Sequence, residues 1–522
     1  MNPRALAGRL RERVAPALAR RFGVDPRALA AVRISVGLLV LADLAIRAGH
    51  LTAFYTDAGA MPRALVGDLY PGLAALSLHA LSGAAWFQAV LFALAGLAAV
   101  ALALGYRTRL ATAASLVLLV SLHARNPLVL NAGDSVLRRL LFWGLFLPLG
   151  GRWSVDALRR EGTSASRDGP VHRVASVASA ALLVQVVVVY AANGLFKLRG
   201  DSWLSGEGTR IALGLDQLTT GLGSALADFP TLLRLFDWLW LGLLVTSVLL
   251  VVLTGWARAA FAGLFVGMHL GMAVTLNLGV FPLASVAGLV AFLPPKFWDA
   301  AERLWAAHGS RRLAFGRVVD RADRLLPGPV RTDVPKALAR RTRRGASAAR
   351  TGASALRAGW SRAKPAVVGG LLALVLLWNA ATLGYAGMPD AVAETVDPED
   401  YRWDMFAPEP RSDDGWYVVV GTLTTGETRD PLRGGAVRWD RPPDVAATYP
   451  DVRWYKYLVE LQRGQADRLG SAFGEYLCRE WNADHGTEME NLTAYYVEER
   501  VRLDDPETTE RVELFDHSCS PR

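Results

Sequence analysis

One lysine near the middle of the chain has the residue type and position to carry out proton transfer. Lys197 follows an apolar run, residues 179–190, and lies in the sequence Asn193-Gly194-Leu195-Phe196-Lys197-Leu198. Only five of the 57 cationic residues are lysines, so an amine here stands out. Arginine stays protonated in protein sites, whereas a desolvated lysine can give up its proton and act as a base. We therefore expect a functional amine at a membrane edge. The alternative is a lysine whose head group reaches water while its stem packs in lipid.

Further polar residues lie inside or at the outer ends of predicted apolar spans. Asn131 and Asp134 lie at the outer start of the fourth span, Asn277 lies at the outer end of the seventh, and His269 lies about two turns deeper. These groups could meet Lys197 in one outward-facing cavity. The alternative is hydrogen bonding between helices that only holds the bundle together. We favour that alternative for three others: Arg33, Asp43 and Asp237.

Nine apolar runs would position these residues. Helices of about 17–25 residues can cross a bilayer, and the candidates are residues 28–46, 84–104, 110–124, 135–150, 172–196, 232–254, 258–276, 280–295 and 366–386. The third, fourth and eighth runs are short enough to be tilted, broken or partly re-entrant. Residues 47–83 have the polar and aromatic character of an outer loop with a short interfacial helix. The sequence thus predicts an all-α polytopic membrane bundle of about nine transmembrane helices.

Charge predicts the orientation of this bundle. Lys and Arg mark cytoplasmic loops, and they gather in residues 1–27, 107–109, 152–173 and 296–365. We therefore expect a multi-pass protein of the cell membrane with a cytoplasmic N-terminus and an extracytoplasmic C-terminus. The chain is predicted to begin with a basic cytoplasmic segment (1–27) and a transmembrane domain (28–295). A basic cytoplasmic loop (296–365) follows, with amphipathic helices at about 298–326 and 334–363. A last transmembrane helix (366–387) then leads to an acidic outer domain (388–522).

The outer domain has a composition of its own. By count, residues 394–522 hold about 28 of the 48 acidic residues. Residues 416–420 and 492–497 are strand-like because they are rich in β-branched and aromatic residues, and residues 449–481 show helical spacing. We therefore expect a C-terminal extracytoplasmic α+β domain. Cys478 and Cys519, the two cysteines of the chain, both lie in it. A disulfide suits that compartment, and the alternative is two buried free thiols.

Several kinds of chemistry lack support in the sequence. There is no Walker loop, no dinucleotide glycine fingerprint and no zinc-type cysteine spacing, and none of the eight histidines is paired at i, i+4. No metal is predicted. The net charge of +9 arises from loops that border lipid, so attraction to anionic head groups of the bilayer accounts for it better than nucleic acid does.

Several separated segments together resemble a known family. Asn193-Gly194-Leu195-Phe196-Lys197-Leu198, followed by Trp203, is similar to a signature of the vitamin K-dependent γ-carboxylases and their microbial relatives, which carry the horizontally transferred transmembrane (HTTM) domain. The resemblance covers about residues 28–300 well and the tail loosely. The other matching segments are Phe54-Tyr55-Thr56-Asp57-Ala58-Gly59, Trp153-Ser154-Val155-Asp156, His269 with Asn277-Leu278-Gly279-Val280-Phe281-Pro282, and Trp403-Asp404-Met405-Phe406-Ala407-Pro408.

This resemblance implies a chemistry and a cofactor. In the carboxylases, oxygenation of reduced vitamin K to an epoxide generates the strong base that removes the γ-proton of a glutamate. The residue that matches Lys197 would begin this by deprotonating the quinol. By extension Lys197 would be the base, with Asp134, Asn131 and His269 as polar helpers. Asn193, Trp203 and Asn277 would bind a menaquinone-like quinol.

The sequence also departs from the carboxylase pattern. The carboxylases have an Asn-His pair before the fourth span, whereas Asn131-Ala132-Gly133-Asp134 occupies that place here and the histidine is missing. The tail is also shorter, and no segment of it is evident as a site for a substrate propeptide. Two hypotheses follow. The first is a quinol-dependent epoxidase or carboxylase-like enzyme that acts on a protein substrate on the outer face. The second is a non-catalytic membrane protein that binds lipid or a protein partner through its outer domain.

Overall fold

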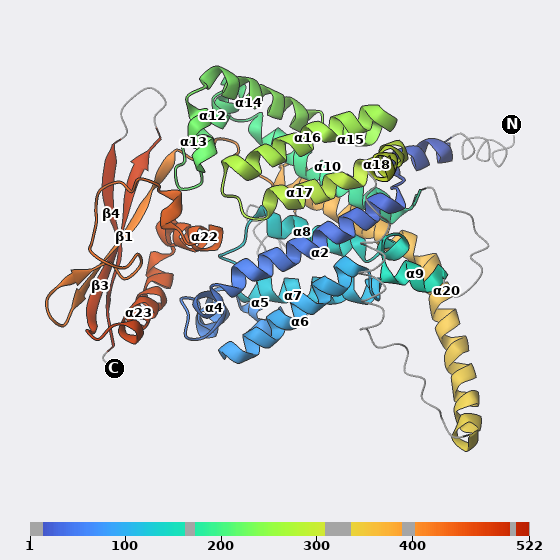
Figure 1. The fold of residues 1–522 in the computed structure, drawn as a ribbon, viewed down its shortest axis with the longest axis horizontal. Helices are drawn as coiled ribbons and strands as arrows, with labels where there is room; N and C mark the ends of the chain where they lie inside the picture. Colours follow the sequence, from blue (N-terminus) through green and yellow to red (C-terminus); the bar gives the residue numbers. More distant parts are fainter. Residues whose placement is uncertain (1–13, 162–172, 308–335, 389–401, 502–507, 521–522) are drawn as a thin grey trace.

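The computed structural model divides into a helical bundle and a C-terminal domain built on a β-sheet (Figure 1). It describes residues 14–161, 173–307, 336–388, 402–501 and 508–520. The predicted amphipathic helix at 298–326 therefore lies mostly outside the described residues. Its beginning forms α18 (Pro295–Ala307).

Five described helices are long and apolar enough to cross a membrane. They are α2 (Pro26–Ala48), α6 (Ala85–Leu104), α10 (Val177–Lys197), α16 (Gly255–Thr275) and the part Ala358–Thr382 of α20. A sixth candidate is a pair bent by 105°, Phe281–Phe292 followed by α18; its first part holds α17 (Phe281–Leu289) and a 3₁₀ turn, Val290–Phe292. An apolar bundle is thus confirmed, but nine spans are not.

The remaining predicted spans correspond to shorter or more polar helices. They are α7 (Thr108–Arg125), α8 (Ala132–Gly144), and α14 (Pro230–Val245) followed by α15 (Leu249–Val252). A helix the length of α8 spans about 20 Å, less than the roughly 30 Å of a hydrocarbon core. Short helices make up much of the connecting segments: α3 (Leu51–Tyr55), α4 (Arg63–Leu69), α5 (Pro71–Leu76), α9 (Val155–Glu161), α11 (Asp201–Ser205), α12 (Gly208–Leu213) and α13 (Gly221–Ala227).

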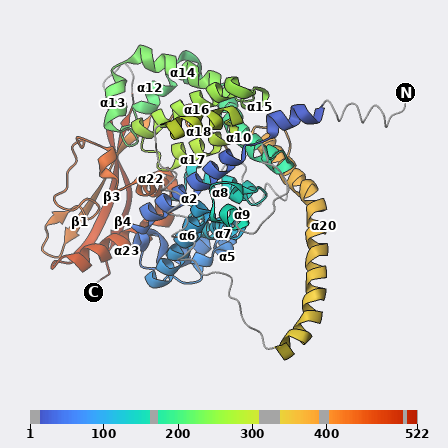
Figure 2. The ribbon, with the colours of Figure 1, turned by 45° about the vertical axis from the view of Figure 1, so that its right-hand side comes forward.

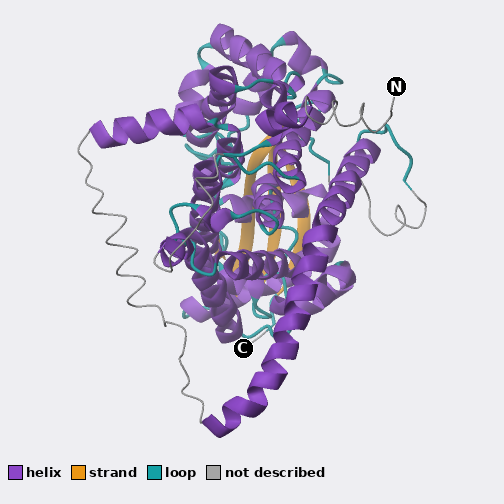
Figure 3. Cartoon of the chain, turned by 90° about the vertical axis from the view of Figure 1, so that its right-hand side faces the viewer, coloured by secondary structure: helices purple, strands orange, loops and turns teal. Residues whose placement is uncertain are grey.

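The helix before the outer domain is longer than the sequence predicts. We expected an amphipathic helix at 334–363 and a separate span at 366–386, but α20 runs without a break as Lys336–Thr382 (Figures 1 and 3). The change within α20 from basic to apolar residues marks where its membrane-spanning part begins. It does not interrupt the backbone hydrogen bonds, because these are internal to a helix. Pro365, at this boundary, also lies inside the helix.

The C-terminal domain is an antiparallel four-stranded sheet with helices against it. Its strand order is β2 (Thr428–Arg429), β1 (Asp413–Leu423), β3 (Met489–Arg500), β4 (Thr509–Ser518), so both predicted strands are confirmed. The predicted helical segment forms α22 (Val452–Glu460) and α23 (Ala466–Asp484), separated by a kink at Gly464 with φ +92°. The α+β fold is therefore confirmed. Cys478 in α23 and Cys519 after β4 form the predicted disulfide.

α22 connects the two parts of the molecule. It lies between the sheet and the ends of the bundle helices in two views (Figures 1 and 2). The Tyr457 hydroxyl donates to the carbonyl of Ala60 at 3.0 Å, and the ring of Trp454 lies 4.7 Å from that of Phe54. The C-terminal domain, the predicted outer domain, is thus packed on the loop after α2.

Candidate functional site

Lys197 is the last residue of α10 and lies inside the protein. A Ser176 capping box begins this helix, and Gly194 allows its outer end to lie against Leu244 of α14. Lys197 is only 2% exposed, so the alternative of a head group that reaches water is wrong. Its chain neighbours Asn193 and Phe196 are buried with it.

The opening segment of the outer domain covers the amine. Lys197 Nζ donates to the carbonyl of Phe406 at 2.9 Å, and Trp203 Nε1 donates to the same oxygen at 2.8 Å. Asn193 Nδ2 donates to the carbonyls of Trp403 and Met405 at 3.1 and 3.0 Å. The structure therefore brings together Lys197, Asn193 and Trp203. All three donate hydrogen bonds to the backbone of residues 403–406, about 200 residues later in the sequence.

The groups in direct contact with the amine are uncharged. The Nζ atom lies 3.0 Å from the ring centroid of Trp203, over its face. An ammonium group has three N–H donors, and the described polar acceptor for them is the Phe406 carbonyl. Within the described part of the chain, no carboxylate forms an ion pair with Lys197. An aromatic face can stabilise the cation when a proton is gained.

Glycine permits this close cover. Gly200 follows α10, and a Cβ there would collide with the Pro408 carbonyl. The side chain of Glu409 accepts a hydrogen bond from the Ser202 backbone at 3.2 Å. Residues 193–203 and 403–409 are thus packed against each other and joined by hydrogen bonds along their length.

His269 lies deeper in the bundle, in an aromatic environment. Its ring is buried, with centroids 5.6 Å from Tyr190, 5.5 Å from Trp240 and 5.9 Å from Phe281. Nδ1 lies 2.8 Å from the Phe265 carbonyl, and Nε2 has no hydrogen-bond partner. Tyr190 is two turns before Lys197 on the same face of α10, so it connects the two regions.

Asn131 and Asn277 have structural contacts near this region. Asn131 caps α8 through Oδ1, which accepts from the Gly133 backbone at 2.9 Å, while its Nδ2 has no partner. The backbone N–H of Asn277 donates to Leu218 O at 2.7 Å. Gly133 lies against Phe281, because a Cβ there would be 2.7 Å from the Phe281 nitrogen. Asn131 is therefore close to the α16–α17 junction, which holds Asn277.

Asp134 belongs to a different arrangement, which we call the ion-pair cluster: Asp43, Arg47, Asp134 and Arg453. All four are at most 1% exposed. Arg47 contacts Asp43 at 2.8 Å and Asp134 at 2.7 Å, and Arg453 forms ion pairs with both aspartates. Two guanidinium groups balance two carboxylates. A cation held by Asp43, Asp134 and the nearby His123 would have to displace these arginines.

Arg47 and Arg453 are not among the site residues predicted from the sequence. Arg453 lies on a helix of the outer domain, yet its Nη1 donates to the Val129 carbonyl at 2.7 Å inside the bundle. The i, i+4 spacing of Asp43 and Arg47 on a predicted span is a signal that could have revealed the first pair. Nothing local marks Arg453, whose partner Asp43 is 410 residues away.

The three residues assigned to helix packing do hold the bundle together. Arg33 donates to backbone carbonyls of residues 149, 152 and 153. Asp237 accepts from the Gly208 backbone at 2.9 Å and from the Thr209 hydroxyl at 3.0 Å. Asp43 pairs as described above. These contacts give each residue a structural role.

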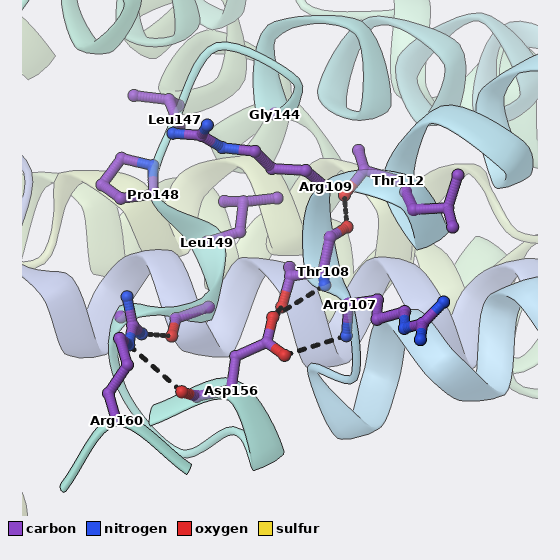
Figure 4. A pocket seen from close by; sticks show the side chains of 13 residues that line it. Arg107, Thr108, Arg109, Thr112, Gly144, Leu147, Pro148, Leu149, Asp156 and Arg160 are labelled. Atoms are coloured by element: carbon purple, nitrogen blue, oxygen red, sulfur yellow. Dashed lines mark hydrogen bonds between the residues drawn. The ribbon is translucent and has the colours of Figure 1, made fainter. Parts of the chain in front are cut away.

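A large cavity lies at the other end of the bundle, beside the start of α7 and the end of α8. It has a volume of about 550 Å³, and its lining includes three basic residues, Arg107, Arg109 and Arg160, beside Asp156 and mostly small or apolar residues (Figure 4). Asp156 accepts from the Thr108 backbone at 2.8 Å and the Thr108 hydroxyl at 2.7 Å, which anchors the start of α7. Lys197 does not line this cavity.

Comparison with known proteins adds one finding. The family model of the HTTM domain matches residues 23–298, more than half of the chain. The matched region begins just before α2, ends in α18, and holds Lys197, Asn193, Trp203 and His269. No curated protein and no solved structure matches the chain.

Proposed function

Because the chain belongs to the HTTM domain family, we propose that it is a membrane enzyme in which Lys197 takes a proton from a lipid-soluble quinol of the reduced menaquinone type. One observation carries the proposal. A lysine at the end of an apolar helix is almost completely buried, and it faces a carbonyl and an aromatic ring in place of an acid. A group that accepts a proton during a reaction must be able to exist in both states near the working pH.

Several buried polar groups of the protein lack partners that the oxygens of a quinol would supply. Its two oxygens need hydrogen-bond partners within apolar surroundings. Three buried polar atoms in this part of the protein have no partner: Asn131 Nδ2, His269 Nε2 and Trp403 Nε1. Aromatic rings of Tyr190, Trp240 and Phe281 surround His269. The quinol itself would supply the reducing electrons for oxygenation by dioxygen.

Different residues of the chain would accept the proton, stabilise the ammonium and position its acceptor. Lys197 Nζ accepts the proton, and the Phe406 carbonyl and the Trp203 face stabilise the ammonium that forms. Asn193 is a positioning residue, because it holds the 403–406 backbone that supplies that carbonyl. Burial excludes water, which strengthens each of these interactions.

The resemblance to the γ-carboxylases supports the same assignment. The histidine that they carry before the fourth span is missing here, but His123 of α7 places its Nε2 3.3 Å from Asp134. A histidine beside this position is therefore supplied by another helix. A protein substrate and a carboxylation step belong to the same proposal, and both rest on the resemblance alone.

Quinol-dependent oxygen uptake tests this proposal. Purified protein in liposomes is given reduced menaquinone, and uptake is compared among the wild type, Lys197→Ala and Lys197→Arg. We expect both substitutions to lower the rate at least about a hundredfold, the lower range for loss of a general base. Lys296→Arg changes an exposed lysine and should leave the rate unchanged.

A second variant distinguishes positioning from packing. Asn193→Ala frees the 403–406 backbone and should lower kcat while KM for quinol changes little. Equal uptake by the wild type and Lys197→Ala, with both shown to be folded, would contradict the proposal. It would favour the non-catalytic protein that binds lipid or a partner through its outer domain.

A further inference from the structure

A second cavity lies within the bundle, away from Lys197. It has a volume of about 270 Å³ and is lined by residues of four helices: Val120 of α7, Arg138 and Arg139 of α8, Gln185 of α10 and Val375 of α20. We call it the lateral cavity. Gln185 is 12 residues before Lys197, about 18 Å along α10, and Lys197 does not line the cavity.

Gln185 is the first sign that the lateral cavity binds a ligand. The side chain is 4% exposed, and neither Oε1 nor Nε2 has a hydrogen-bond partner. Burying an amide without partners is unfavourable, because its hydrogen bonds to water are lost. A bound oxygen atom would accept a hydrogen bond from Nε2 and so supply a partner that the described protein atoms do not.

Arg139 is the second sign. Its Nη1 donates to the Ser135 carbonyl at 3.2 Å, and its guanidinium lies 4.4 Å from the ring centroid of Trp403. Both partners are neutral. Within the described ranges of the chain, no carboxylate pairs with Arg139. A cation in apolar surroundings without an anion is costly, and compensation by an anion is the usual solution.

Its size and surroundings indicate what kind of molecule could occupy the lateral cavity. Its volume suits a head group and not a whole lipid. Val120 at its edge is 40% exposed and lies on the same face of α7 as Val117, which is 56% exposed. This apolar outer face is where lipid chains would lie, so the cavity is reached from the membrane side.

We propose that the lateral cavity binds the acidic head group of a membrane-resident amphiphile, with Arg139 pairing with its anionic oxygen and Gln185 donating to a second oxygen. The hydrocarbon chain lies outside, along α7 and α20. The shared chemistry is an anionic oxygen on an apolar chain, which a phospholipid phosphate and a fatty-acid carboxylate both provide. Guanidinium groups bind both in a bidentate manner.

Native mass spectrometry of the full-length protein tests the proposal. The protein is delipidated in neutral detergent and titrated separately with dioleoylphosphatidylglycerol, oleate, dioleoylphosphatidylcholine and menaquinone. We expect one tight site for phosphatidylglycerol or for oleate, and whichever binds identifies the source of the acid. Arg139→Gln should weaken it about tenfold or more, because a charge-assisted hydrogen bond is lost.

Two further variants separate binding from folding. Val120→Trp alters an exposed position and should block the entrance, which gives the same loss without touching a charge. Gln185→Leu should weaken binding severalfold. Arg109→Gln, in the cavity beside the start of α7, is the matched control and should bind normally.

Three outcomes would overturn the proposal. They are equal affinity for phosphatidylcholine, equal or greater affinity for menaquinone, and acid binding that is unchanged in both Arg139→Gln and Val120→Trp.

Discussion

Each residue of the ion-pair cluster is held where neither water nor lipid reaches it. Removal of one partner from a buried ion pair leaves an uncompensated charge, which costs much more than the pair itself contributes. Arg453 is the member that comes from the outer domain, and it contacts both aspartates. We infer that the cluster makes the bundle and the outer domain depend on each other for stability.

Arg453→Met tests this role. We expect it to destabilise the protein by about 3–5 kcal/mol, because Asp43 and Asp134 would lose a shared cation. Thermal unfolding in detergent, followed by fluorescence, measures the effect. Arg463→Met removes an arginine that is 48% exposed beside Glu460 and should change stability by no more than about 1 kcal/mol. Equal thermal unfolding midpoints for the two variants would show that the ion-pair cluster does not stabilise the protein as proposed.

Some site residues could be predicted and others could not. Lys197, Asn193 and Trp203 are close in sequence and lie in one motif, so their meeting follows from local structure. The covering segment at 403–406 was noticed as a motif, but its place over Lys197 depends on packing between distant parts of the chain. Arg138 and Arg139 lie in a predicted span, and two adjacent charges at membrane depth should have been flagged.

Among the elements, the loop at residues 214–220 meets strand β1 through a buried acid. Asp414 accepts hydrogen bonds from the backbone of Asp216 at 2.7 Å and Gln217 at 3.2 Å. Burial raises the pKa of Asp414 to about 7, while these backbone hydrogen bonds act in the opposite direction. Asp216 and Glu499 lie next to it, and Arg441 pairs with both.

This contact should respond to pH. The pKa of Asp414 is about 7 in the folded protein and about 4 in an unfolded chain, so protonation favours the folded state. Its contribution is fully present below about pH 4 and is lost as pH rises through about 7. Asp414→Asn keeps a hydrogen-bond acceptor and cannot ionise. We expect the midpoint difference, variant minus wild type, to increase from pH 5 to pH 8.

A matched variant serves as the control. Asp440→Asn changes an exposed aspartate and should give a flat difference over the same range. If Asp414→Asn were equally flat, the carboxyl would not be the group that titrates.

Elements with a clear period could be predicted from the sequence. β1 and β3 were found because β-branched and aromatic residues mark them, and the disulfide because both cysteines lie in the outer domain. The number of spans could not be found in the same way. α8 and α14 are apolar enough to suggest crossings, but helix length and bending decide whether a run crosses. α20 showed that a change in polarity does not end a helix.

For the whole molecule, the charge distribution predicts a fixed orientation in the membrane. Both natural cysteines are in the disulfide, so a single introduced cysteine is the one free thiol. Glu427→Cys in the outer domain and Glu302→Cys in α18 alter side chains that are each 55% exposed. We expect an impermeant maleimide applied to intact cells to label the first and spare the second until the membrane is opened. If Glu302→Cys were labelled and Glu427→Cys were not, the orientation in the membrane would be the opposite of the predicted one.

If Lys197 starts the oxygenation of a quinol, oxygen from dioxygen must enter the quinone product, and isotope labelling detects it. Reconstituted protein is incubated with reduced menaquinone under ¹⁸O₂, and the quinone products are analysed by mass spectrometry. We expect an epoxide carrying ¹⁸O from the wild type and from Lys296→Arg, and none from Lys197→Ala. Folded wild-type protein that forms no labelled product, or Lys197→Ala that forms as much as the wild type, would contradict this role of Lys197.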